Sequence, residues 1–218
     1  MQKEFWLERW EKAQIGFHDN AVNSHLNKFW GALRLSPGPQ VFVPLCGKSV
    51  DMRWLQEQGC SVLGVELSDI AARDFFRENA YQAQLEALPA FQKYSAQDIS
   101  ILAGDFFDLT PQELGKVAAV YDRAAMVALP ADMRARYVQH LRHILPSGTQ
   151  ILLVTFDYPQ QEMTGPPFAL PAAEVAALYQ PFADMVLLET VDVLEQNLRF
   201  KQRGLTRLQE SVYLLTLR

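Results

Sequence analysis

The chain has 218 residues, of which 49% are hydrophobic and 21% charged, and its net charge is −5. This composition is typical of a globular protein and excludes disordered, collagen-like and coiled-coil chains. It contains no run of 18 apolar residues for a membrane span, and its start lacks the apolar core of a signal peptide. We therefore expect a cytoplasmic protein without a membrane segment, and nothing in the composition demands more than a monomer.

The charge and the cysteines exclude further classes of protein. Affinity for nucleic acid depends on a basic surface, which this acidic chain does not offer as a whole. The basic residues between Arg199 and Arg207 are interpreted as a solvated loop. Two cysteines, Cys46 and Cys60, are too few for a disulfide framework or a zinc site. We expect neither a nucleic-acid partner nor a metal.

Apolar periodicity predicts helices and strands that alternate along most of the chain. In chain order they are a helix over 22–33, a strand over 41–43, a helix over 52–58, a strand over 61–66, a helix over 71–79, strands over 99–103 and 117–121, a helix over 133–144, a strand over 150–156, a helix over 171–179, and strands over 185–193 and 211–217. Such alternation is typical of a mostly parallel sheet with helices on both faces. The last two strands have no helical pattern between them and should pair as an antiparallel hairpin. We expect one α/β domain over residues 1–218 with an N-terminal helical extension.

The segment Pro44-Leu-Cys-Gly-Lys-Ser49 follows the first predicted strand. Open parallel sheets bind ligands at the carboxyl ends of their strands, beside the first strand. Gly47 permits a sharp turn there, and the next helix offers free N–H groups to an anion or a carboxylate. The Gly-Lys-Ser trio is not a triphosphate-binding loop, because that loop requires a second glycine where Phe42 stands.

Glu66 ends the second predicted strand, 22 residues after Pro44. An acid about 20 residues on, at this position, accepts hydrogen bonds from ribose hydroxyls. A glutamate at a strand end can also cap the next helix or face solvent, and that alternative stays open here. The dinucleotide fingerprint G-x-G-x-x-G is absent, which argues against a nicotinamide-dependent oxidoreductase. A smaller adenosine ligand that carries an amino-acid tail fits better.

The next two strand ends carry acidic, aromatic and basic side chains. Asp105 follows the third strand, where an acid can accept from the adenine amino group. Of the two following aromatic residues, Phe106 and Phe107, one can cover the adenine ring, and at least one belongs to the core. The fourth strand ends in Asp122-Arg123. An arginine there can hold an anionic substrate with its planar fork, or form a structural ion pair with the neighbouring aspartate.

Several short motifs along nearly the whole chain resemble those of a known family. They are Trp6-Leu-Glu-Arg-Trp10, Gly16-Phe17-His18, Pro44-Leu-Cys-Gly-Lys48, Gly64-Val-Glu66, Asp105-Phe-Phe-Asp108-Leu109, Asp122-Arg123, Gly165-Pro-Pro-Phe168 and Tyr213-Leu-Leu-Thr216. Each motif is weak alone, but together and in this order they resemble the thiopurine S-methyltransferases, among the class I S-adenosylmethionine-dependent methyltransferases. The resemblance implies a Rossmann-like, seven-stranded, mostly parallel sheet of order 3-2-1-4-5-7-6, with strand seven antiparallel.

The resemblance also implies the cofactor, S-adenosylmethionine, and the residues around it. Residues 1–36 would form a helical lid over the cofactor site, with Trp6 and Trp10 facing it. Leu45 would lie against the methionine part. The remaining implied cofactor contacts are Glu66 at the ribose, Asp105 and Phe106 beside the adenine, and Arg123.

For the methyl acceptor, the resemblance places Phe17 beside an aromatic substrate and Arg123 between donor and acceptor, as the catalytic candidate. His18, next to Phe17, is a further candidate on the acceptor side. The segment 197–206 does not match the substrate-side loop of animal members. The expected activity is methyl transfer to the sulfur of thiols such as thiopurines, and selenium and tellurium compounds are further acceptors associated with bacterial members. The alternative is a cofactor-binding sensor without turnover.

Overall fold

A computed structural model describes residues 3–16 and 18–218, which form two compact units. The first unit contains the described residues up to Lys28 together with Arg34–Tyr121, and the second contains Phe29–Leu33 and Asp122–Arg218. The single domain over 1–218 and the lid over 1–36 stay predictions. Among the described residues, no helix combines the length and the apolar character that crossing a membrane requires.

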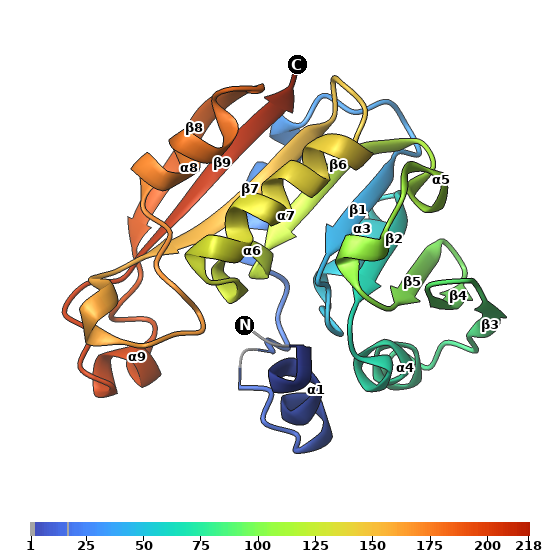
Figure 1. The fold of residues 1–218 in the computed structure, drawn as a ribbon, viewed down its shortest axis with the longest axis horizontal. Helices are drawn as coiled ribbons and strands as arrows, with labels where there is room; N and C mark the ends of the chain where they lie inside the picture. Colours follow the sequence, from blue (N-terminus) through green and yellow to red (C-terminus); the bar gives the residue numbers. More distant parts are fainter. Residues whose placement is uncertain (1–2, 17) are drawn as a thin grey trace. The chain divides into compact units, whose positions relative to one another are not determined.

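The strands of the first unit follow the order β3-β4-β5-β2-β1-β6, of which β6 belongs to this unit as far as Tyr121 (Figure 1). In chain order their bounds are β1 (Gln40–Pro44), β2 (Ser61–Glu66), β3 (Gln84–Ala87), β4 (Gln92–Ala96), β5 (Ile99–Ala103) and β6 (Val117–Arg123). β5, β2, β1 and β6 are parallel neighbours, which confirms the predicted order 3-2-1-4. Their carboxyl ends therefore meet at one edge, where the sequence places its site.

The prediction of seven strands is wrong, because the described residues contain nine. The two extra strands, β3 and β4, form an antiparallel hairpin that extends the sheet beyond β5. All four residues of β3 are exposed, and in β4 only Tyr94 is buried. A strand that buries so little carries no alternation of apolar and polar residues, so the periodicity could not reveal it.

Four helices of the first unit surround its strands in the sequence, and two of them pack against the central strands. The four helices are α1 (Lys3–Glu11), α3 (Asp51–Glu57), α4 (Asp69–Glu78) and α5 (Pro111–Leu114). α3 and α4 pack against β2 and β5, and α1 lies beside α4. The helix predicted over 22–33 is shorter: α2 covers Ser24–Phe29, and a 3₁₀ turn follows over Trp30–Ala32.

The second unit contains an antiparallel sheet of order β7-β9-β8. Its elements are α6 (Ala125–Ala128), α7 (Ala131–Ile144), β7 (Gln150–Asp157), α8 (Ala172–Tyr179), β8 (Ala183–Asp192), α9 (Leu198–Gln202) and β9 (Gln209–Leu217). β9 runs antiparallel to both neighbours, which confirms the predicted order 5-7-6 and the terminal hairpin. The hairpin contains a helix, α9, that was not predicted. Only Phe200 of that helix is buried, so it has no amphipathic repeat.

Candidate functional site

Glu66 closes the turn that follows β1. Its side chain is buried, at 6% exposure, and its two oxygens accept hydrogen bonds from the Gly47 and Ser68 amides, both at 2.8 Å. Ser68 is the N-cap of α4, so one carboxylate joins the glycine turn to the start of the helix. A carboxylate has about four acceptor positions, so Glu66 keeps acceptor capacity for a ligand's hydroxyl group beside the two amides. The capping role and the ribose role are therefore compatible.

Trp10 of α1 lies directly over this turn. A Cβ atom placed on Gly47, whose φ is +52°, would lie 3.2 Å from Cζ2 of the Trp10 ring. Trp10 is buried, whereas Trp6 is half-buried and packs edge-on against Phe5, with ring centroids 5.3 Å apart. The structure thus brings Trp10 and the glycine turn together. A contact of Trp6 with the cofactor stays a prediction.

Leu45 and Cys46 form the middle of the turn. Leu45 has φ of +48°, a conformation that non-glycine residues rarely adopt and that the surroundings must hold in place. Burial, helped by the negative charge of Glu66, raises the pKa of the Cys46 thiol well above its usual value. Cys46 is therefore a packed thiol and not a nucleophile.

Gly64 of β2 lies under the Cys46 side chain. A Cβ atom on Gly64 would lie 2.6 Å from Cys46 Sγ and 3.2 Å from Met52 Sδ. We expect Gly64→Ala to lower the free energy of unfolding by about 1–3 kcal/mol, because both buried neighbours must move. Chemical denaturation of the purified variant measures this loss. Gly31→Ala is the control, since its added Cβ meets no atom within 4 Å; equal stabilities of the two variants would contradict the prediction.

Asp105 and Phe106 lie where β5 ends. Asp105 accepts a hydrogen bond from the Phe107 amide at 2.9 Å and forms an ion pair with Lys3 of α1 at 2.5 Å. The Phe106 ring is buried, at 3% exposure, and stacks against Phe42 of β1 with centroids 6.5 Å apart. Phe106 is thus the core member of the aromatic pair. Its place beside an adenine stays a prediction.

The acceptor-side residues are distributed over both units. Arg123 belongs to the second unit, where it ends β6 and is partly exposed. His18 belongs to the first unit, and Phe17 lies outside the described residues. Burial, and then the positive charge of Lys48, lower the pKa of His18. The lowered pKa favours the neutral imidazole, which can accept a proton or a hydrogen bond.

Two polar contacts around the turn were not predicted. Lys48 Nζ binds both carboxylate oxygens of Glu78, at 2.7 and 2.8 Å, and so joins the turn to α4. Asp51, at 1% exposure, accepts hydrogen bonds from the Asn23 amide at 2.8 Å and the Tyr121 hydroxyl at 2.9 Å. These partners lie about 30 to 70 residues apart, and no local pattern identifies such pairs.

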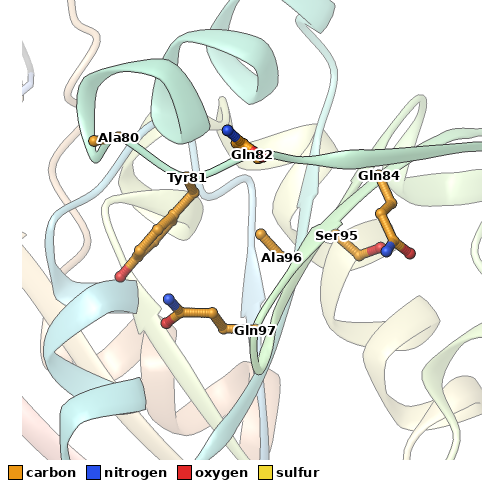
Figure 2. A pocket seen from close by; sticks show the side chains of 7 residues that line it. All are labelled: Ala80, Tyr81, Gln82, Gln84, Ser95, Ala96 and Gln97. Carbon is orange, nitrogen blue, oxygen red and sulfur yellow. The ribbon is translucent and has the colours of Figure 1, made fainter.

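A separate pocket of about 390 Å³ opens elsewhere in the first unit (Figure 2). Its lining residues are Ala80, Tyr81, Gln82, Gln84, Ser95, Ala96 and Gln97. This lining contains no charged side chain and none of the predicted site residues, so the pocket is not a candidate for the predicted site. In the described part of the chain, no group of three or more His, Cys, Asp or Glu side chains could hold a metal ion.

Comparison with known proteins decides the family. The family described as Thiopurine S-methyltransferase (TPMT) matches residues 1–218. The chain belongs to the thiopurine S-methyltransferase family. A thiopurine S-methyltransferase of Nitrosospira multiformis is 54% identical over 218 residues, which cover 100% of this chain and 99% of the relative. One from Pseudomonas aeruginosa (strain LESB58) is 48% identical over 215 residues, 99% of each chain.

Solved structures of other methyltransferases share the fold of this chain. An S-adenosylmethionine-dependent methyltransferase from Anabaena variabilis aligns over 99% of this chain and 95% of its own, with a TM-score of 0.68 and 15% identity. Another, from Thiobacillus denitrificans in complex with S-adenosyl-L-homocysteine, aligns over 100% and 99%, with a TM-score of 0.64 and 16% identity. The predicted Rossmann-like methyltransferase fold is confirmed. As a member of its family, the chain is an S-adenosylmethionine-dependent methyltransferase.

Proposed function

We propose that this methyltransferase moves the methyl group of S-adenosylmethionine to the sulfur of an aromatic or heterocyclic thiol, with thiopurines among its acceptors. One observation carries the proposal: the family matches the whole chain, residues 1–218. The first unit supports the binding of the cofactor, because the buried Glu66 carboxylate at the glycine turn keeps acceptor capacity beside the two amides that it binds. The partner is therefore a small molecule.

In this proposal, the cofactor lies at the carboxyl ends of β1, β2 and β5. Glu66 accepts from the ribose hydroxyls, Asp105 accepts from the adenine amino group, and Leu45 contacts the methionine part. Trp10 covers the glycine turn, and a tryptophan face attracts a cation by about 0.5–2 kcal/mol. Trp6, Phe106 and Arg123 complete the proposed set of cofactor contacts.

S-adenosylmethionine supplies a methyl group on a sulfonium cation, and the reacting thiolate takes it in line. A cation and an anion become two neutral products, so a site that excludes water favours the transition state over the hydrated reactants. Holding donor and acceptor in line can contribute roughly 7–11 kcal/mol. Aromatic thiols ionise near neutral pH, so the residues need not include a strong base.

On the acceptor side, we propose that Arg123 holds the thiolate or a ring nitrogen with charge-assisted hydrogen bonds. We propose that Phe17, which lies outside the described residues, flanks the aromatic ring, and that His18, the next residue, acts on the same side of the acceptor. The lowered pKa of His18 supports this role, because a neutral imidazole can receive a hydrogen bond from a thiol or a ring N–H.

Methyl transfer from radiolabelled S-adenosylmethionine to a panel of acceptors tests the proposal. The panel contains 6-mercaptopurine, thiophenol, selenite, tellurite, a phenol and an amine. We expect label on the two sulfur acceptors and none on the phenol or the amine. Label on selenite or tellurite would extend the substrate class to those elements. Binding of the cofactor in calorimetry without label on any acceptor would contradict the proposal and favour a sensor.

We further propose that the protein is a cytoplasmic monomer that binds no nucleic acid. Its two cysteines, Cys46 and Cys60, are both free and buried, which fits a reducing compartment. Light scattering after size exclusion measures the mass in solution, and a mass of twice 24.8 kDa would contradict the monomer.

A further inference from the structure

A buried carboxylate precedes Arg123 in the second unit. Asp122 is 0% exposed and accepts a hydrogen bond from the Tyr137 hydroxyl of α7 at 2.6 Å. It also accepts from the Met126 amide of α6, at 3.4 Å. The Tyr179 hydroxyl of α8 in turn contacts Met126 Sδ at 3.4 Å. Asp122 thus joins the end of β6 to α6 and α7 in one buried polar cluster, which we call the Asp122 cluster.

The backbone that follows Arg123 is held in an uncommon conformation. Ala124 has φ of +68°, in the left-handed region, and it is the N-cap residue directly before α6. Non-glycine residues adopt this region only where the surrounding structure over-determines it. Here the Asp122 carboxylate binds the first turn of α6, across the strained residue. Arg123 is therefore fixed on both sides, by an anchored neighbour before it and a constrained one after it.

The free-energy cost of burying the Asp122 carboxylate indicates that this residue does more than fill space in the core. Burying a carboxylate is expensive even when it is hydrogen-bonded, and an apolar residue of similar volume would be cheaper. Burial raises the pKa of Asp122 to about 6, against the hydrogen bonds from Tyr137, Met126 and Ala125, which lower it. The hydrogen bonds that Tyr137 and Met126 donate favour the ionised form of Asp122, which acts only as an acceptor.

We propose that Asp122 is a positioning residue for methyl transfer: through the Asp122 cluster it fixes the turn from which Arg123 reaches the acceptor. This inference rests on the role proposed above for Arg123. Asp122 itself touches neither substrate nor cofactor in this proposal. A side chain displaced by a small distance can lose much of its catalytic effect, because positioning can supply a large share of a rate enhancement.

A double-mutant cycle tests the proposal. We expect Asp122→Asn to lower kcat about 5- to 50-fold, while the Kd for S-adenosylmethionine stays within about twofold. If Asp122 acts through Arg123, the same change made in an Arg123→Lys background lowers kcat by less than about twofold. An equal loss of kcat in the two backgrounds would overturn the proposal.

Tyr137→Phe is the second variant, because it keeps the buried acid and removes one donor. It should lower kcat and move the acid limb of the pH profile of kcat to higher pH, since the ionised carboxylate loses a hydrogen bond that lowers its pKa. The groups that face Asp122 are Tyr137 and Tyr179, and the tyrosine pKa values lie far above this range. The matched control is Tyr94→Phe, whose hydroxyl binds Asp69 at the same 2.6 Å in the first unit. Equal kcat values and pH profiles for the two tyrosine variants would also overturn the proposal.

Failure of this inference and failure of the proposed function give different results. Unchanged kcat in Arg123→Lys alone would remove Arg123 from the reaction, and Asp122 with it. A slow Arg123→Lys enzyme beside a fully active Asp122→Asn enzyme would remove only Asp122. If the Asp122→Asn variant is folded but inactive and also binds the cofactor more weakly, Asp122 supports the fold in general. That result would overturn its positioning role.

Discussion

Replacing Glu66 with alanine will raise the Kd for S-adenosylmethionine about 5- to 150-fold, which corresponds to about 1–3 kcal/mol. Two losses combine in this result. The ribose hydroxyls lose a charged acceptor, and the Gly47 and Ser68 amides lose the oxygens that each of them binds at 2.8 Å. Isothermal titration calorimetry with the purified protein measures the change.

An analogue that lacks a ribose hydroxyl separates the two losses. The wild-type protein should bind a 2′-deoxyribose analogue more weakly than S-adenosylmethionine, whereas the Glu66→Ala variant should bind both equally. Glu86→Ala is the control, because Glu86 is an exposed acid of the same unit that pairs with Lys93. Discrimination between the two ligands that survives in Glu66→Ala would remove Glu66 from the ribose.

The pH dependence of binding gives a further arm of the same experiment. Burial raises the pKa of Glu66 despite the amide hydrogen bonds that lower it. The folded protein therefore binds a proton at Glu66 more readily than the unfolded chain does. As the pH rises through the folded pKa, Glu66 loses this proton and the free energy of unfolding falls. Ribose hydroxyls donate to the ionised form, so cofactor affinity should fall on acidification through that raised pKa. Glu66→Ala should lack this dependence.

The sequence predicted the parts of the fold that bury apolar residues. β2 and β5 were predicted residue for residue, because five of the six residues of β2 and four of the five of β5 are buried. The hairpin of β3 and β4 and the short helix α9 were missed, since each buries a single side chain or none. Apolar periodicity arises from burial, so elements that lie on the surface show little periodicity.

Topology predicts where Glu66 lies, because an acid that ends the second strand must lie at the carboxyl edge of the sheet. Its role at a ribose stays a prediction. Its second function, closing the turn at Gly47, requires the folded backbone, as do the bonds of Lys48 to Glu78 and of Asp51 to Asn23. The direction of one turn decides whether Phe106 or Phe107 is buried, and no pattern in the sequence predicts that direction.

Arg123→Lys should lower kcat roughly 10- to 100-fold while the Kd for S-adenosylmethionine changes only a few-fold. The planar guanidinium can offer two parallel N–H donors to an anion, whereas the lysine ammonium is a point charge on a flexible stem. Hydrogen bonds to a charged group are worth about 1.5–3 kcal/mol, which sets the size of the expected loss. The effect falls on kcat because the proposed contact matters most while the acceptor sulfur reacts.

Single-turnover methyl transfer with radiolabelled cofactor measures the chemical step separately from product release. Arg53→Lys is the matched control, because this exposed arginine pairs with Glu57 one helical turn away on α3. An acceptor panel sharpens the test, since Arg123→Lys should slow thiopurines, which offer ring nitrogens to the fork, more than thiophenol, which has none. Equal slowing of the two acceptors would limit Arg123 to the reacting sulfur, and wild-type rates with both would remove it from the site.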